Sequence, residues 1–181
     1  MKTLSWGLLG TARINRALIP PLRASARNRL LAVASRHPDA ASAYAREWGI
    51  ERAHGSYETL LSDPEIDVVY ISLPNGLHAE WAIRAAQAGK HVLCEKPLAV
   101  TVAQVDRVAA AAREAGVTVA EAFMYRHHPQ TARVRELVVA GALGRVRFVR
   151  GTFSFPLTRP RTCAFNPPSA GGRCGTWAAT P

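Results

Sequence analysis

Two neighbouring stretches decide the fold of this chain: Asp67-Val-Val-Tyr-Ile-Ser-Leu-Pro-Asn75-Gly-Leu-His78 and Gly89-Lys-His-Val-Leu-Cys-Glu95-Lys96-Pro97. Each contains a short, nearly continuous apolar run, residues 68–72 or 91–94, followed by polar residues. Apolar runs of this kind are typical of parallel strands that are buried on both faces. The polar residues behind each run are therefore expected at the carboxyl edge of a parallel sheet, where doubly wound folds bind their ligands.

Apolar runs of strand length alternate with longer segments of helical period over most of the chain. The expected strands are 4–9, 30–35, 52–54, 68–72, 91–94 and 117–120, and the expected helices are 14–24, 39–48, 57–61, 78–88, 102–115 and 130–140. Such alternation is typical of repeated strand-helix-strand units. The sequence therefore predicts the α/β class, with a Rossmann doubly wound parallel sheet forming a dinucleotide-binding domain over residues 1–122.

A second domain is expected to begin after residue 122. Residues 123–158 contain one segment of helix length and then an alternating strand, Val146 to Phe155, for which no partner strand is recognisable. We interpret this part as the start of an incomplete α/β substrate domain.

The turn Gly10-Thr11-Ala12-Arg13-Ile14 follows the first expected strand and leads into the first expected helix. In that position, backbone N–H groups and the helix dipole bind a pyrophosphate. Ala12 and Asn15 stand where a full glycine fingerprint has its second and third glycines. The turn alone is therefore equally consistent with a plain connection between strand and helix.

The second expected strand ends at Ala34-Ser35-Arg36, where NAD-specific sites usually carry an acidic residue for the ribose 2′-hydroxyl. Ser35 and Arg36 offer a hydroxyl and a guanidinium, which suit a 2′-phosphate. This favours NADP over NAD as cofactor. The alternative is that Arg36 is a solvated surface residue.

Lys96 follows a buried strand and precedes a proline. An ammonium group at the mouth of the sheet can hydrogen-bond a substrate hydroxyl or the carbonyl that forms from it, and so stabilise developing charge. A surface lysine without a role is the alternative. His78 has two interpretations as well, a residue of the binding loop or a helix-start residue packed on that loop.

These motifs resemble the signature of the Gfo/Idh/MocA oxidoreductases. The resemblance runs in family order over residues 4 to about 158, and it includes Trp6-Gly-Leu-Leu-Gly10-Thr-Ala-Arg-Ile14, the two stretches quoted first, and Glu121-Ala-Phe-Met-Tyr-Arg126-His-His128-Pro129. It implies hydride transfer between NADP or NAD and a secondary hydroxyl of a sugar, polyol or trans-dihydrodiol, in a homo-oligomeric enzyme. A non-catalytic dinucleotide-binding regulator is the alternative, since some relatives of this fold have that role.

The resemblance also implies roles for individual residues. Lys96 is implied as the catalytic lysine and Glu95 as a residue that positions the cofactor. The loop Leu73-Pro74-Asn75, with His78, is implied to lie along the ribose and nicotinamide. Arg126 and His128 border the active site in this interpretation, although both could be surface residues at a helix start.

Charge and cysteine content exclude other classes. The net charge is +10, but six arginines and no acidic residue follow Glu136, and no nucleic-acid-binding motif accompanies them. The three cysteines and the histidines lack metal-ligand spacing, so neither a metal nor nucleic acid is expected. With no secretory segment and no membrane-spanning stretch, the sequence predicts a cytoplasmic protein with free thiols.

Residues 160–181 have no hydrophobic period and do not continue the family pattern. Back-translating 170–181 and regrouping the bases permits Gly-Gly-Ala-Leu-Trp-Asp-Val-Gly-Cys-Tyr-Pro, which resembles the second-domain motif that holds the family's proton-transferring tyrosine. We infer a reading-frame slip between about Thr158 and Arg161, so that 159–181 is an out-of-frame tail, expected to be disordered, and the truncated chain is inactive. A genuine short protein with a basic tail is the alternative.

Overall fold

The computed structural model describes residues 2–152, and the chain divides into two compact units, Met1–Ala122 and Phe123–Pro181. The first unit contains a six-stranded sheet in the order β3-β2-β1-β4-β5-β6, and all of its pairings are parallel. The strands are β1 (Leu4–Leu9), β2 (Asn28–Ala34), β3 (Arg52–His54), β4 (Val68–Ile71), β5 (His91–Cys94) and β6 (Val119–Glu121). This order is that of a Rossmann fold, which confirms the predicted fold class.

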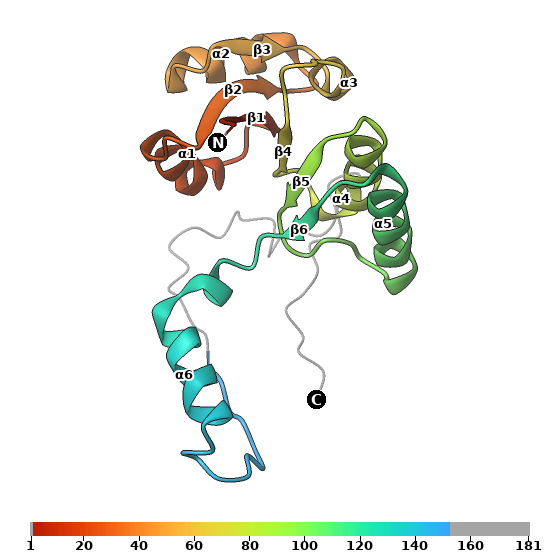
Figure 1. The fold of residues 1–181 in the computed structure, drawn as a ribbon. Coiled ribbons are helices and arrows are strands. Elements are labelled where there is room, and N and C mark those ends of the chain that lie inside the picture. Colours follow the sequence, from red (N-terminus) through yellow and green to blue (C-terminus); the bar gives the residue numbers. More distant parts are fainter. Residues whose placement is uncertain (1, 153–181) are drawn as a thin grey trace. The chain divides into compact units, whose positions relative to one another are not determined.

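Five helices of the first unit connect the strands (Figure 1). They are α1 (Asn15–Ala24), α2 (Pro38–Trp48), α3 (Tyr57–Leu61), α4 (Asn75–Gln87) and α5 (Val102–Ala115). Among these helices, the largest difference from the sequence prediction is at α4, which begins at Asn75 rather than at residue 78. Pro74 precedes the helix with an extended backbone, so the first turn forms directly behind the proline.

The sheet is covered on both faces by different helices. On one face, α1 and α2 pack on it through Ile19 and Ala45, together with Leu8, Val33 and Tyr70 of the strands. On the other face α3, α4 and α5 cover Leu9, Val69 and Ile71 through apolar side chains, which include Leu60, Ala82 and Val108. Figure 1 shows α4 and α5 side by side next to β5. Because successive strand residues point to opposite faces, the continuous apolar runs of β1 and β4 supply both layers.

The second unit contains a 3-10 helix, η1 (Met124–His127), and the helix α6 (Pro129–Val139). The predicted strand Val146 to Phe155 is wrong for residues 146–152, which are not in a strand. A strand needs a neighbour for its backbone N–H and C=O groups, and the described residues supply none. Residues 153–155, the frame-slip junction and the proposed out-of-frame tail lie outside the described residues. The assignment of 123–158 to a substrate domain stays a prediction.

Candidate active site at the switch point of the sheet

The order of the strands reverses between β1 and β4, which are neighbours in the sheet although β2 and β3 separate them in sequence. Chain connections leave such a point in opposite directions, and in doubly wound folds the ligand-binding crevice lies there, outside the carboxyl ends of the two strands. Gly10 follows β1 and Ser72 follows β4 at this edge. Ser35 and Glu95 follow the flanking strands β2 and β5. The structure thus brings the predicted cofactor-binding segments to one edge of one sheet.

Gly10 makes this close approach of β1 and β4 feasible. Its φ is +104°, in a region that L side chains rarely adopt, and a Cβ there would lie 3.0 Å from Leu73 Cδ2 and 3.3 Å from the Ser72 carbonyl oxygen. The glycine therefore meets a backbone and a steric requirement at once. Any side chain at this position would push the turn away from the end of β4.

The turn after Gly10 presents unused hydrogen-bond donors. Within the described part of the chain, no hydrogen bond engages the backbone N–H groups of Thr11, Ala12, Arg13 or Ile14. Helix α1 starts directly behind them with no side-chain cap and no acidic residue in its first turn. Four consecutive free N–H groups at the positive end of a helix fit an anionic group such as a pyrophosphate.

Ser35 and Arg36 lie at the end of β2. Ser35 is buried, and its Oγ accepts a hydrogen bond from the His37 backbone N–H at 3.3 Å. Arg36 is exposed, and its guanidinium lies near the hydroxyl of Tyr57, the first residue of α3. Burial raises the pKa of the Tyr57 phenol, and the charge and hydrogen bond of Arg36 oppose that rise. Arg36 is thus an exposed residue at the carboxyl end of β2 whose charge acts on Tyr57.

His78 is enclosed between the two loops that the sequence places at the active site. The side chain is only 1% exposed; its Nδ1 lies 2.7 Å from the Pro97 carbonyl oxygen and its Nε2 lies 2.7 Å from that of Leu73. The imidazole therefore connects the loop after β4 to the turn that contains Lys96. This is the arrangement of a helix-start residue packed on its loop, and it ties both loops together.

Glu95 is fixed through both of its carboxylate oxygens. The hydroxyl of Tyr70 donates to Oε1 at 2.6 Å, and the backbone N–H of Lys96 donates to Oε2 at 3.3 Å. Burial, with smaller contributions from Glu95 and its neighbours, raises the pKa of Tyr70 far above its usual range. The phenol therefore stays protonated and remains a donor. Lys96 itself is exposed, at the carboxyl edge of the sheet.

Cys94 lies directly before this pair, and its side chain is buried. Burial, assisted by the nearby carboxylates of Glu95 and Glu121, raises the pKa of the Cys94 thiol to about 12. A thiol with that pKa stays protonated near neutral pH and is therefore a poor nucleophile. No group of His, Cys, Asp and Glu side chains within residues 2–152 is arranged to hold a metal ion.

Arg126 and His128 belong to the second unit. Arg126 is in η1 and is exposed. His128 precedes α6, and its Nδ1 accepts a hydrogen bond from the Gln130 backbone N–H at 3.2 Å, so it caps that helix. Their expected contact with cofactor or substrate stays a prediction.

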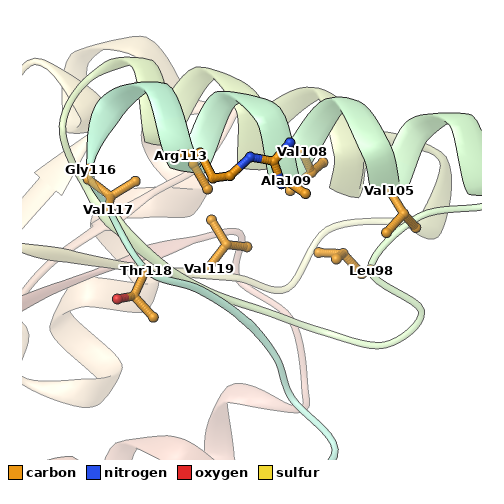
Figure 2. Close-up of a pocket in the computed structure, with 10 residues that line it drawn as sticks. Leu98, Val105, Val108, Ala109, Arg113, Gly116, Val117, Thr118 and Val119 are labelled. Carbon is orange, nitrogen blue, oxygen red and sulfur yellow. The ribbon is translucent and has the colours of Figure 1, made fainter.

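A groove of about 450 Å³ lies between α5 and the edge strand β6 (Figure 2). Its walls include Leu98, Val105, Val108 and Val119, and none of the predicted cofactor-binding residues lines it. The groove is therefore separate from the crevice at the switch point.

Tyr70, Asn15 and Tyr57 support the site but were not predicted from the sequence as site residues. The place of Tyr70 follows from the strand pairing: it lies opposite Leu93, and residues two apart in a strand share a face. That register places Tyr70 and Glu95 on the same face. It becomes visible only when the pairing of β4 with β5 is known.

The sequence model of the oxidoreductase family with an NAD-binding Rossmann fold (GFO_IDH_MocA) matches residues 4–123. The chain therefore belongs to the Gfo/Idh/MocA oxidoreductase family, as the motifs predicted. Helices long and apolar enough to cross a membrane were sought in the described residues, and there are none.

Curated relatives include two dehydrogenases. A D-xylose 1-dehydrogenase (NADP(+)) of Haloferax volcanii is 51% identical over 155 residues, which are 85% of this chain and 47% of the relative. A trans-1,2-dihydrobenzene-1,2-diol dehydrogenase of Xenopus laevis is 39% identical over 159 residues, or 86% of this chain and 48% of the relative. The chain thus spans about half the length of the curated relatives it matches.

Among solved structures, the 3-ketoreductase KijD10 of Actinomadura kijaniata, in complex with TDP-benzene and NADP, superimposes with a TM-score of 0.72. The two sequences are 40% identical, and the match covers 77% of this chain and 44% of KijD10. The similarity thus includes a structure that was solved with a dinucleotide bound.

Proposed function

We propose that this chain provides the cofactor-binding half of an NADP-dependent oxidoreductase, which transfers a hydride between the nicotinamide and a secondary hydroxyl of a sugar, polyol or trans-dihydrodiol. One observation carries the proposal. The free N–H groups of 11–14 and the Glu95-Lys96 pair follow β1 and β5, and β4 lies between these strands. A phosphate-binding turn and a charged lysine thus share one edge of the sheet.

The substrate class rests on the names of the relatives. One is a xylose dehydrogenase, one a dihydrodiol dehydrogenase and one a ketoreductase crystallised with a nucleotide-linked ligand. All three names describe the interconversion of a hydroxyl and a carbonyl group, or a diol substrate.

Different residues of the chain have different roles in such a reaction. The nicotinamide, when bound, accepts or supplies the hydride. The turn 11–14 binds the pyrophosphate, and Glu95 helps to position the cofactor. The Lys96 ammonium orients the substrate oxygen and stabilises the charge that develops on it. This role requires Lys96 to be accessible to a substrate, which agrees with its exposure at the carboxyl edge of the sheet.

The proposed preference for NADP rests on Arg36, because this exposed residue follows β2 and a guanidinium can pair with the 2′-phosphate. Replacing Arg36 by Ala is expected to weaken NADP binding about tenfold or more and to leave NAD binding within about twofold. Asp39→Asn is the matched control, since it changes a charge in the first turn of α2. Equal losses for both dinucleotides would remove the basis for this preference.

Turnover tests the catalytic part of the proposal. The 181-residue chain and a version with the reading frame restored beyond residue 158 are assayed with NADP and with D-xylose, other sugars, polyols and trans-dihydrodiols. We expect NADP binding by both and turnover by the restored chain alone. If the restored chain binds NADP but turns over none of these substrates, the regulatory alternative is favoured. Sequencing the DNA across codons 155–165 tests the frame slip itself.

Three further expectations complete the proposal. We expect the intact protein to be a homo-oligomer in the cytoplasm, and its substrate to be a small molecule rather than nucleic acid. Light scattering on the restored chain and cell fractionation test these points.

A further inference from the structure

Asn15, the first residue of α1, bridges the two ends of the phosphate-binding turn. Its side chain is fully buried, and Nδ2 donates a hydrogen bond to the Gly10 carbonyl oxygen at 2.9 Å. Gly10 is the residue that follows β1, and Asn15 is the first residue of α1. The free N–H groups of 11–14 therefore lie in a loop that one side-chain hydrogen bond closes.

The phenol of Tyr44, in α2, interacts with the side-chain amide of Asn15. Burial raises the pKa of the Tyr44 phenol, and its interaction with Asn15 is the main influence that lowers it. The two side chains are thus neighbours, but the geometry falls short of a formed hydrogen bond. Both the Tyr44 hydroxyl and Asn15 Oδ1 are buried without a partner elsewhere in residues 2–152. An amide lowers the pKa of a phenol by donating to its oxygen, so Asn15 Nδ2, which has a second N–H group besides the one bonded to Gly10, is the atom that faces Tyr44.

We propose that Asn15 is the positioning residue of the cofactor-binding turn and that Tyr44 supports it. The proposal rests on the proposed binding of NADP. Asn15 occupies the position at which a full fingerprint has its third glycine, whose usual task is close packing of the helix on the strand. In this chain, the hydrogen bond from Asn15 to the Gly10 carbonyl oxygen replaces that packing contact. Holding Gly10 and the start of α1 together keeps the four N–H groups oriented before a phosphate arrives, which lowers the ordering cost of binding.

The test compares two ligands that share the 2′-phosphate. NADP carries a pyrophosphate for the turn, whereas adenosine 2′-monophosphate carries none. In calorimetric titrations of the 181-residue chain, Asn15→Ala is expected to raise the Kd for NADP by about tenfold or more and to leave that for adenosine 2′-monophosphate within about twofold. Tyr44→Phe, which removes only the hydroxyl, is expected to raise the Kd for NADP about threefold.

Asn28→Ala is the matched control. Asn28 lies at the opposite end of β2, and its amide also makes two side-chain hydrogen bonds, with Trp6 and Ser25. We expect this variant to keep both affinities. A general loss of folded protein in Asn15→Ala would lower both affinities together, and that result would overturn the proposal, as would an unchanged Kd for NADP.

A readout without ligand separates this inference from the proposed function. In nuclear magnetic resonance spectra of the ligand-free chain, the side-chain amide protons of Asn15 are expected to exchange slowly with solvent and to exchange faster in Tyr44→Phe. If the wild type binds no NADP, the proposed function fails, while slow exchange would still support the bridge. Fast exchange in the wild type would overturn the bridge even if NADP binds. Should Asn15→Ala not fold, Tyr44→Phe alone decides the outcome.

Discussion

The hydroxyl of Tyr70 and the carboxylate of Glu95 are joined by a hydrogen bond of 2.6 Å, although the residues are 25 positions apart in sequence. Tyr70 is 2% exposed and lies in the layer under α1, whereas Glu95 is partly exposed at the end of β5. The hydroxyl of a core residue, Tyr70, thus binds the carboxylate of Glu95, which is the residue next to Lys96. Because the Tyr70 side chain is buried, its hydroxyl fixes the orientation of the Glu95 carboxylate.

Tyr70→Phe removes this hydrogen bond without changing the packing volume much. We expect the free energy of unfolding to fall by about 1 kcal/mol, because Glu95 can be rehydrated in part. The measurement is urea unfolding of Tyr70→Phe, Glu95→Ala and the double variant. A coupling free energy near zero in this cycle would show that the bond does not contribute. Tyr125→Phe, which alters an exposed tyrosine, serves as the control.

His78→Ala removes the connection between the Leu73 and Pro97 carbonyl groups. We expect a loss of about 2–3 kcal/mol in the free energy of unfolding, since one imidazole hydrogen bond is lost and a buried cavity is left. Amide exchange should also increase at residues 95–98. His78→Gln retains an amide donor and should lose less stability. Equal stability of wild type and His78→Ala would contradict the role of His78 in connecting the two loops.

The carboxylate of Asp67 gives the fold a dependence on pH. Burial acts to raise the pKa of Asp67, but hydrogen bonds from Lys2 at 2.6 Å and the Ser5 backbone N–H at 2.9 Å, with the charge of Lys90, lower it overall. A lowered folded-state pKa means that the contribution is complete above the ordinary carboxyl pKa and is lost as the pH falls through the folded value.

Asp67→Asn is therefore expected to lower the free energy of unfolding by about 1 kcal/mol at pH 7. The difference between wild type and variant should shrink as the pH falls through the lowered folded-state pKa of Asp67, because the wild-type carboxyl then becomes protonated as well. Urea unfolding over a series of pH values from 7 downwards measures it. A difference that is constant with pH would assign the effect to packing instead of charge.

Lys96→Ala in the frame-restored chain should separate catalysis from cofactor binding. We expect kcat to fall about 100-fold or more, because the ammonium acts mainly where charge develops, and the Kd for NADP to stay within about threefold. Lys90→Ala is unsuitable as a control, since the buried Lys90 Nζ donates to two backbone carbonyl groups. Lys2→Ala is the better choice, because the Lys2 side chain is exposed and its ion pair with Asp67 lies at the opposite edge of the sheet. An unchanged kcat would make Lys96 a structural residue.

The sequence predicted those features that depend on local pattern. The apolar runs gave the strands, and the residues behind them, such as Ser35 and Glu95, were placed at the correct edge. Contacts such as Tyr70 with Glu95 depend on which strands are neighbours and in what register, and a single sequence does not contain that information. The strand expected at 146–155 was wrong over the described residues 146–152 for the same reason. Its alternation of apolar and polar residues favours a strand, but a strand also needs a partner strand, which this local pattern does not supply.

The measurement that tests the central claim most directly is amide hydrogen exchange of the 181-residue chain with and without saturating NADP. If the crevice at the switch point binds the dinucleotide, exchange should slow at the donor turn 11–14, at 35–37, at 73–78 and at 95–97, because bound phosphates and the ribose occupy these groups. The groove between α5 and β6 and the opposite edge of the sheet should not change. No protection at the turn 11–14, or protection centred on that groove, would contradict the account.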